Sequence, residues 1–278
     1  MATEWKYVEL DSVCELIVDC VNRTAPVVDY VTPYRMIRTT DVKDGRIDLT
    51  NSRHVSKQVF DRWARRGAPR KGDVVLTREA PLGEVGIISE ENVFLGQRLM
   101  MFRPNSLELD SRFLLYSFLG SELHNQVMNL GRGSTVEHMR VPDAKKLRVK
   151  IPPIEEQHAI ADVLGSLDDK IELNRRMNAA LEETARALFK SWFVDFDPVR
   201  AKMEGREPVG MDAETAALFP DRLVESELGP IPEGWNVCRL GEIIELAYGK
   251  PLKAETRQEG AIPAVSYTHL TLPTIYSV

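Results

Sequence analysis

The chain has 278 residues, a formal net charge of −6 and 43% apolar residues, which is ordinary for a folded protein and argues against intrinsic disorder. No run reaches the length of a membrane-spanning helix, and residues 1–6 lack the apolar stretch of a signal peptide. Cys14, Cys20 and Cys238 are too few and too scattered for a disulfide framework or a zinc site. We therefore expect a protein of the reducing cytoplasm, with no membrane partner and no metal of its own.

Positive charge is concentrated in the first half of the chain. Residues 1–150 carry 23 Lys and Arg against 20 Asp and Glu, a net charge of +3, so the remainder carries −9. Within residues 53–78, eight basic residues face only Asp61 and Asp73. Because the local field matters more than the total charge for attracting a phosphate backbone, the overall acidity does not exclude nucleic acid as a partner.

Residues 1–150 are predicted to form a mixed α/β domain. Apolar and β-branched runs that follow turn signals predict strands, at 72–77, 86–89, 95–102 and 148–151. Between them the period changes, and residues 109–130 fit one apolar face of a helix with Asp110 or Ser111 as its N-cap. A glycine-rich stretch at 131–135 is expected to end that helix.

A heptad pattern dominates the middle of the chain. Ten positions alternate four and three residues apart, as in the seam of a coiled coil; they are Ile160, Leu164, Leu167, Ile171, Asn174, Asn178, Leu181, Ala185, Leu188 and Trp192. The pattern predicts a rod of roughly 33 residues and about 50 Å that begins after Pro152 and Pro153. A core helix of a bundle is the alternative. Two amides in the seam favour a coiled coil, where they fix the register.

The end of the chain is expected to start a second copy of the first module. Trp5-x4-Leu10-x2-Val13-x-Glu15-Leu16 matches Trp235-x4-Leu240-x2-Ile243-x-Glu245-Leu246, with every position displaced by 230. Residues 151–198 are expected to be the spacer helix and its end, and 199–229 a loosely structured connection. The second module, 230–264, is too short to be complete. The almost uncharged tail, 265–278, is expected to be non-native.

Three motifs resemble the specificity (S) subunit of type I restriction–modification enzymes. They are Ile151-Pro152-Pro153-Ile154-Glu155-Glu156-Gln157, Leu167-Asp168-Asp169-Lys170-Ile171 and Leu188-Phe189-Lys190-Ser191-Trp192-Phe193-Val194-Asp195-Phe196-Asp197-Pro198. The stretch 229–235 also resembles the start of that family's second target-recognition domain. The resemblance covers most of the chain and is strongest from 150 to 198.

This resemblance implies an α/β target-recognition domain in residues 1–150, a long coiled-coil helix, and the start of a second, incomplete repeat. In the family, two such domains each read one half of a split double-stranded DNA site, and helical spacers dock the methyltransferase (M) subunits. The resemblance also implies that S-adenosylmethionine, ATP and magnesium are used by the M and restriction (R) partner subunits. The sequence lacks most of the second domain and the second helix.

The candidate DNA-binding residues lie in the basic stretch and in one later loop; they are Arg62, Arg65, Arg66, Arg70, Lys71, Arg78 and Arg132. Their interleaving with His54, Phe60 and Trp63 favours nucleic acid, because arginine contacts guanine edges as well as phosphates. Two alternatives stay open. A charge run is as often a solvated surface, and the glycine-rich loop around Arg132 is as often a plain turn.

No catalytic signature is visible in the sequence. The glycine-rich phosphate motifs, the His-Glu-x-x-His zinc motif and the Asn-Pro-Pro-Tyr type of stretch found in adenine methyltransferases are missing. We therefore expect a recognition subunit that is not an enzyme. Two rival hypotheses stay open, a coiled-coil adaptor that binds only protein and an enzyme with an unfamiliar motif.

The seam also predicts self-association as an antiparallel homodimer. Its positions are symmetric about residue 176, so antiparallel pairing sets Ile160 opposite Trp192 and Leu164 opposite Leu188 of a second copy. Each seam amide then meets an amide. Such a dimer carries two recognition domains and is expected to read a palindromic split site.

Overall fold

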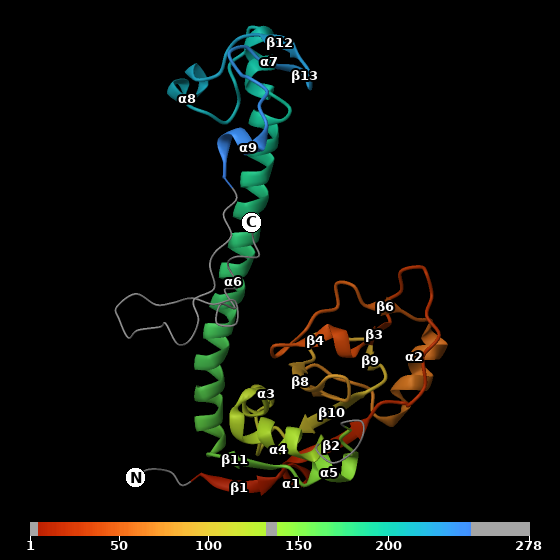
Figure 1. Cartoon of the computed structure of the whole chain (residues 1–278). Helices are drawn as coiled ribbons and strands as arrows, with labels where there is room; N and C mark the ends of the chain where they lie inside the picture. The colour runs from red at the N-terminus through yellow and green to blue at the C-terminus, as the bar shows by residue number, and fades with distance from the viewer. Residues whose placement is uncertain (1–4, 132–137, 246–278) are drawn as a thin grey trace, which may run out of the picture. The chain divides into compact units, whose positions relative to one another are not determined.

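The computed structural model describes residues 5–131 and 138–245 of the chain (Figure 1). The chain divides into two compact units, Met1–Ile171 and Glu172–Val278, and each unit is described by itself. Within the described ranges, no helix is both long enough and apolar enough to cross a membrane.

A four-stranded antiparallel sheet forms the centre of the first unit. Its strands, in spatial order, are β2 (Cys14–Asp19), β10 (Leu99–Pro104), β7 (Val74–Arg78) and β8 (Leu82–Ile87). Successive side chains of a strand point to opposite faces, so Leu76 and Phe102 belong to one hydrophobic core and Val75 and Met101 to another. Both faces of the sheet are therefore covered.

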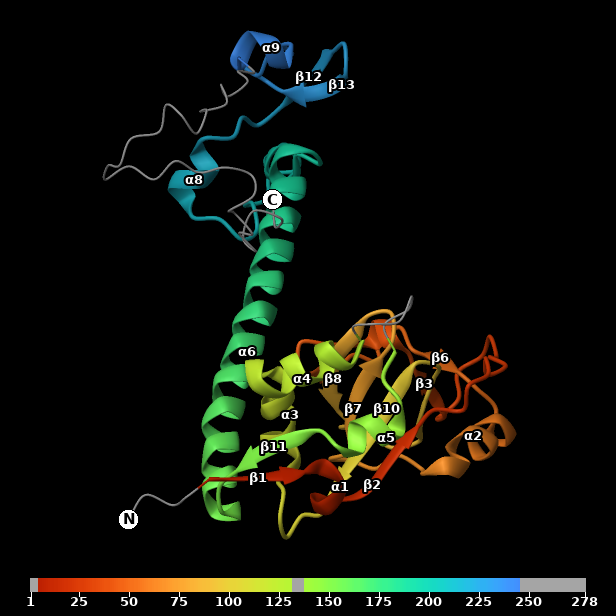
Figure 2. The same ribbon diagram turned by 60° about the horizontal axis from the view of Figure 1, so that its bottom comes forward.

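Two helices, α3 (Ser111–Leu119) and α4 (Ser121–Gly131), cover one face of this sheet (Figure 2). The single helix predicted over 109–130 is wrong, because Gly120 adopts an extended backbone (φ −71°, ψ 147°) between the two helices. The predicted N-cap is confirmed. The carboxylate of Asp110 accepts a hydrogen bond from the backbone N–H of Phe113 at 2.9 Å.

A smaller sheet extends the first unit on the side of the core that contains Val75 and Met101. Its strands, in order, are β6 (Arg53–His54), β3 (Arg35–Ile37) and β9 (Val93–Leu95). Helix α2 (Lys57–Trp63) and the 3-10 turn η2 (Ala64–Arg66) pack on it, around a core of Ala25, Met36, Val55 and Phe94 with Tyr34, Val59, Phe60, Trp63 and Ala64. We call this group the β6–α2 subdomain.

The predicted strands agree in part with the structure. The strand expected at 72–77 is β7, whereas the one expected at 86–89 begins earlier, as β8. The single strand predicted over 95–102 is wrong. The chain forms two strands in different sheets there, because it turns at Arg98, whose φ is 67°. A short hairpin of β4 (Val42–Lys43) and β5 (Arg46–Ile47) crosses the end of β8.

The two ends of the first domain meet in one ladder. Strand β1 (Lys6–Glu9) pairs antiparallel with β11 (Arg148–Ile151), which confirms the last predicted strand. Two short helices next to these strands in the chain, α1 (Leu10–Val13) and α5 (Val141–Lys145), contribute Leu10, Val13 and Ala144 to the main core. Leu10 is fully buried, and its N–H donates to the carbonyl of Leu147 at 2.9 Å.

The predicted rod is a single helix of 40 residues, α6 (Ile154–Phe193). It begins directly after Pro152 and Pro153, as expected, because proline cannot donate the backbone hydrogen bond of a continuing strand. Its first 18 residues lie in the first unit, where Gln157 and Ala161 are fully buried.

Gln157 joins α6 to the domain before it. Its side chain is fully buried and makes three hydrogen bonds to backbone groups. The amide oxygen accepts from the N–H of Asp110 at 3.0 Å, and the amide nitrogen donates to the carbonyls of Glu108 and Pro152, each at 2.9 Å. A buried backbone group without a partner costs about 1–3 kcal/mol, so this one side chain satisfies three groups that would otherwise oppose the junction.

The second unit continues α6 and then folds into short elements. They are α7 (Asp197–Met203), α8 (Ala213–Ala217), β12 (Leu223–Ser226), β13 (Gly229–Pro232) and α9 (Leu240–Ile243). The connection expected at 199–229 thus contains α7, α8 and β12, joined by turns and loops. Val199 and Phe219 are buried in it.

The sequence repeat reappears in the structure. Helix α9 lies 230 residues after α1 at both of its ends, and the N-cap residues Glu9 and Arg239 have nearly the same backbone angles. Burial differs, because Leu10 is 0% exposed whereas its counterpart Leu240 is 66% exposed. The predicted second module beyond residue 245 and the predicted non-native tail lie outside the described residues.

Candidate functional site

Arginines of the basic stretch lie on the exposed side of the β6–α2 subdomain. Arg62 is at the end of α2 and Arg65 is in η2, and both are exposed. The guanidinium of Arg62 lies over the ring of Trp63, 5.5 Å from its centroid. The indole N–H of Trp63 in turn donates to the carbonyl of Arg23 at 3.2 Å. Trp63 therefore lies against one candidate arginine and ties it to the loop that carries Arg23.

Arg66 and Arg78 meet at a single carboxylate. Asp19, at the end of β2, pairs with Arg66 and accepts from Nη1 of Arg78 at 2.8 Å. Arg66 also donates to the carbonyl of Cys20, and Nη2 of Arg78 lies 3.1 Å from Nε2 of His138. The side chain of Arg78 is only 9% exposed. These contacts give Arg78 an internal, structural role, and DNA contact by this side chain stays a prediction.

Arg70 and Lys71 lie at the other end of the central sheet. They precede β7, and the ammonium of Lys71 is 3.8 Å from Glu91. Just before Arg70, the carbonyl of Ala68 accepts a hydrogen bond from Arg103 of β10. The structure therefore divides the described members of the predicted set among the β6–α2 side, the start of β7 and, for Arg78, the end of β7. Arg132 lies outside the described residues.

Sequence reasoning missed Arg23. This exposed residue lies 40 positions before Trp63, so no local pattern links the two. Its only sequence signal is a basic residue in a loop rich in turn formers, which is too weak to select it. With Arg23, Arg62 and Arg65, the β6–α2 side presents three exposed guanidinium groups to solvent, which suits phosphates and guanine edges.

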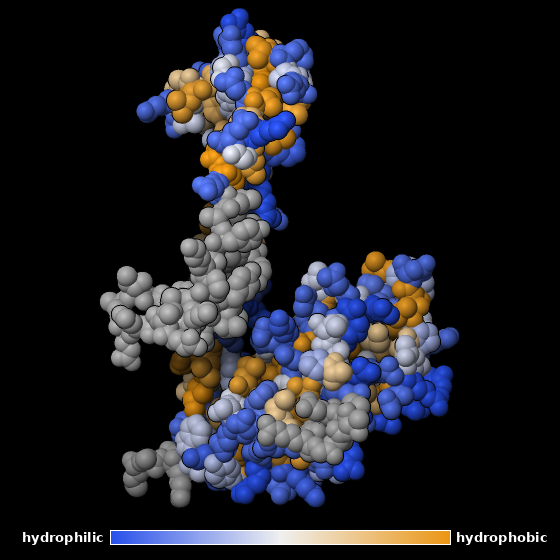
Figure 3. All heavy atoms as spheres, in the orientation of Figure 1, coloured by the Kyte–Doolittle hydropathy of each residue, from blue (hydrophilic) through white to orange (hydrophobic). Residues whose placement is uncertain are grey.

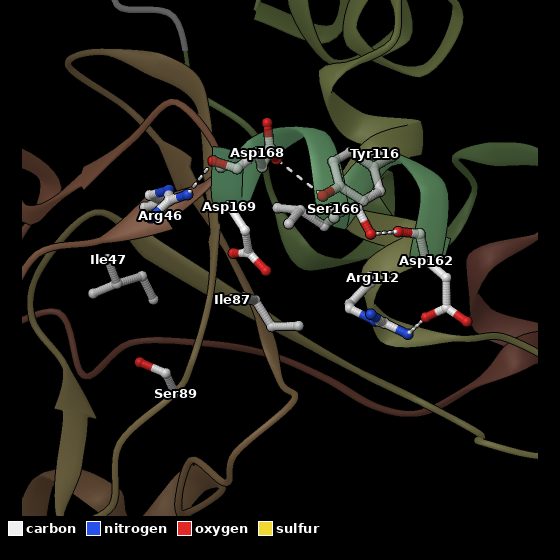
Figure 4. A pocket seen from close by; sticks show the side chains of 13 residues that line it. Arg46, Ile47, Ile87, Ser89, Arg112, Tyr116, Asp162, Ser166, Asp168 and Asp169 are labelled. Carbon is white, nitrogen blue, oxygen red and sulfur yellow. Dashed lines mark hydrogen bonds and ion pairs between the residues drawn. The ribbon is translucent and has the colours of Figure 1, made fainter. Parts of the chain in front are cut away.

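A cavity of about 540 Å³ is lined by the β4–β5 hairpin and by residues 162–169 of α6 (Figure 4). Polar contacts span it. Arg46 donates to the backbone carbonyl of Asp168 at 3.0 Å, the hydroxyl of Tyr116 donates to the Asp168 carboxylate at 2.9 Å, and Arg112 pairs with Asp162 at 2.6 Å. These bonds hold the domain against α6 at Asp162 and at Asp168, which belongs to the Leu167–Ile171 motif.

Two raised pKa values bear on the chemistry of the first unit. Burial, helped by the hydrogen bond to Asp168, raises the pKa of Tyr116 to about 12, so this phenol stays protonated and acts as a donor. Burial raises the pKa of the Cys14 thiol to about 12 as well, which leaves it unreactive as a nucleophile. Among the described residues, no group of three or more His, Cys, Asp or Glu side chains is placed to hold a metal ion.

The predicted seam of α6 changes its surroundings along the helix. Ile160 and Leu164 line a small groove with Trp5 and are partly covered by the domain. Further along, apolar seam residues are open to solvent: Leu167, Ile171, Leu181 and Leu188 are 54, 48, 63 and 41% exposed. Asn174, Asn178 and Ala185 are exposed too.

Ile160 and Leu164 lie close to the buried residues Gln157 and Ala161 at the start of α6, whereas the seam residues from Asn174 on belong to the second unit. At the end of the seam, in the second unit, the ring of Trp192 stands edge-on to the ring of the buried Phe219, with ring centroids 6.1 Å apart.

Comparison with known proteins places these features in a family. Residues 2–183 match the family model described as Type I restriction modification DNA specificity domain. The chain is 29% identical over 226 residues to the type I restriction enzyme HindI specificity subunit of Haemophilus influenzae, covering 66% of this chain and 49% of that protein. It is 30% identical over 202 residues to the MjaIX specificity subunit of Methanocaldococcus jannaschii, covering 72% and 42%.

Solved structures of specificity subunits also match. The HsdS subunit of Thermoanaerobacter tengcongensis aligns with a TM-score of 0.46 at 17% identity, over 76% of this chain and 52% of that one. The S subunit of M. genitalium aligns with a TM-score of 0.44 at 19% identity, over 73% and 46%. The chain spans about half the length of the curated relatives it matches.

Proposed function

Because the chain belongs to the family of type I restriction–modification DNA specificity domains, we propose that it recognises double-stranded DNA by sequence within a restriction–modification complex. Its first unit reads one half of a split target. The exposed part of α6 docks methyltransferase (M) subunits, and the complex also takes up a restriction (R) subunit. The complex works in the cytoplasm.

The observation that carries this proposal is the exposed arginine surface of the β6–α2 subdomain. Arg62 is held over Trp63, and Trp63 is anchored to the loop of Arg23. A side chain that is already held loses less conformational freedom on binding than a free one. The surface thus offers positioned donors for phosphates and base edges, in a domain whose relatives are named specificity subunits.

We propose that the chain itself performs no chemistry. S-adenosylmethionine, ATP and magnesium act on the partner subunits. The partly buried thiol of Cys14 supports this, because its pKa is raised and a reactive cysteine needs a lowered pKa. Arg66 and Arg78 both pair with Asp19 inside the unit, as in a structural ion cluster.

We further propose that the 278-residue chain pairs with a second copy through α6, antiparallel. The exposed leucines of the seam support this, because burying a leucine stabilises a complex by about 1.5–3 kcal/mol. Asn174 of one copy then faces Asn178 of the other. The pair presents two recognition domains and reads a palindromic split site.

Selection from a pool of DNA duplexes with a random central segment tests the recognition proposal. The purified chain is expected to enrich one short sequence and to bind it about a thousandfold more tightly than a scrambled duplex at the same salt concentration. Retention of every sequence with equal affinity, or of no DNA at all, would contradict the proposal.

A further inference from the structure

The loop between β2 and β3 has an exposed tip that carries a carboxylate, a phenol and an apolar side chain. Its residues Asp29, Tyr30 and Val31 are all exposed, and Val31 is 85% exposed. An apolar side chain held so far out of the core gains nothing for folding. We call these three residues the tip. In Figure 3, hydrophobic surface stands among hydrophilic surface at the end of the domain that carries β6 and α2.

The tip is held rigidly on both sides. Before it, the N–H of Val28 donates to the carbonyl of His54 at 2.9 Å. After it, the hydroxyl of Thr32 donates to the carbonyl of Val55 at 2.8 Å, and the carbonyl of Thr32 lies 2.8 Å from Nδ1 of His54. Both flanks therefore fasten to His54 at the end of β6, the second also to Val55, and the three residues of the tip lie between these attachments.

The subdomain around the tip is strongly basic. Residues 22–34 and 53–66 contain six Lys and Arg but only two carboxylates, and one of these, Asp61, pairs with Lys57 at 2.7 Å. The two segments share one core and are tied by the Trp63–Arg23 hydrogen bond. Charge complementarity thus selects a polyanion as the partner of this surface.

The tip differs in chemistry from the basic subdomain around it. It carries a carboxylate and no cation, so phosphates do not suit it. Base edges do. The thymine methyl group takes apolar contacts, as Val31 offers, and the amino group of cytosine donates to carboxylates such as that of Asp29. The hydroxyl of Tyr30 can both donate and accept.

We propose that the tip, Asp29–Val31, enters a groove of the DNA and contacts base edges, while the surrounding arginines hold the phosphates. This inference rests on the proposed DNA recognition and deepens it. It assigns sequence discrimination to a loop outside the basic stretch and assigns affinity to that stretch. Because the tip is pinned to β6, it keeps its place relative to the arginines of α2 and η2.

The double substitution Tyr30→Ser/Val31→Ser tests the assignment in the full chain. Duplexes with a random central segment serve as the probe, selected by wild type and by the variant. We expect the variant to lose its preference at one or two base pairs and to bind the wild-type sequence about tenfold or more weakly, the scale of a single mismatch. Binding to a scrambled duplex and its salt dependence are expected to stay unchanged, because neither substitution removes a charge.

Leu107→Ser is the matched control. Leu107 is 82% exposed in the same unit but lies in the turn before α3, far along the chain from the basic stretch, and its variant is expected to select the wild-type sequence. Val31→Thr, which keeps the branched shape, guards against a folding defect, and thermal unfolding of each variant is measured in parallel. The Val31→Thr variant is expected to weaken the preference at the same base pair.

The outcomes separate the two proposals. If wild type enriches no sequence, the proposed function fails. If wild type enriches a sequence and the folded double variant enriches the same one with equal affinity, only the role of the tip is wrong. A variant whose loss is equal on scrambled DNA and whose salt dependence becomes shallower would also overturn base contact by the tip.

Discussion

Replacing Leu167 and Leu181 by aspartate is expected to turn the purified chain from a dimer into a monomer. These seam residues are 54 and 63% exposed on α6 and make no contribution to the core that holds the first unit. In an antiparallel pair each faces apolar side chains of the second copy. A carboxylate forced into such a contact loses its hydration and finds no partner, which costs several kcal/mol.

Leu173→Asp supplies the matched control for this substitution. Leu173 is 58% exposed on the same helix, but it lies off the seam, so its variant is expected to remain dimeric. Sedimentation at tens of micromolar protein reads the mass directly. A monomeric wild type at that concentration would rule out pairing through α6, and a dimeric double variant would place the contact elsewhere.

Replacing Arg62 and Arg65 by glutamine is expected to make DNA binding weaker and less dependent on salt. Each phosphate contact releases about one counterion, so losing two contacts lowers the slope of log K against log salt by about two. Arg66 is left in place because it pairs with Asp19, and its loss would disturb the end of β2.

A second double variant controls for the change in net charge. Arg140→Gln/Lys145→Gln removes two exposed charges from the same unit, where they pair with Asp143 and Asp11. Its salt slope is expected to match that of wild type. An unchanged slope for the Arg62/Arg65 variant would show that the basic stretch is only a solvated surface and would favour a protein-binding adaptor.

Much of the helical organisation could be predicted because it depends on local periodicity. The start of α6 follows from Pro152 and Pro153, and the heptad predicts roughly 33 of its 40 residues. The break at Gly120 could not be foreseen, since the apolar pattern continues across it from α3 into α4. A glycine within an apolar helical pattern is compatible both with one continuous helix and with a break between two helices.

The arrangement of the site depends on contacts between distant segments, which no sequence window contains. Arg66 and Arg78 meet at Asp19, 47 and 59 residues earlier in the chain. Arg23 joins the candidate surface only because Trp63 reaches its carbonyl. Likewise, the Gln157 motif was visible in the sequence, but its role as the buried link to Asp110 required the fold.

Mapping DNA methylation in a reconstituted mixture tests the central claim most directly. The purified chain, supplied with duplex DNA, S-adenosylmethionine, ATP and magnesium, is expected to transfer no methyl group and to cut no strand. Addition of the methyltransferase subunit with which it forms a complex is expected to produce methylation confined to the sequence that the chain alone selects. Turnover by the chain alone, or methylation by the partner at the same sites without this chain, would contradict its role as the recognition subunit.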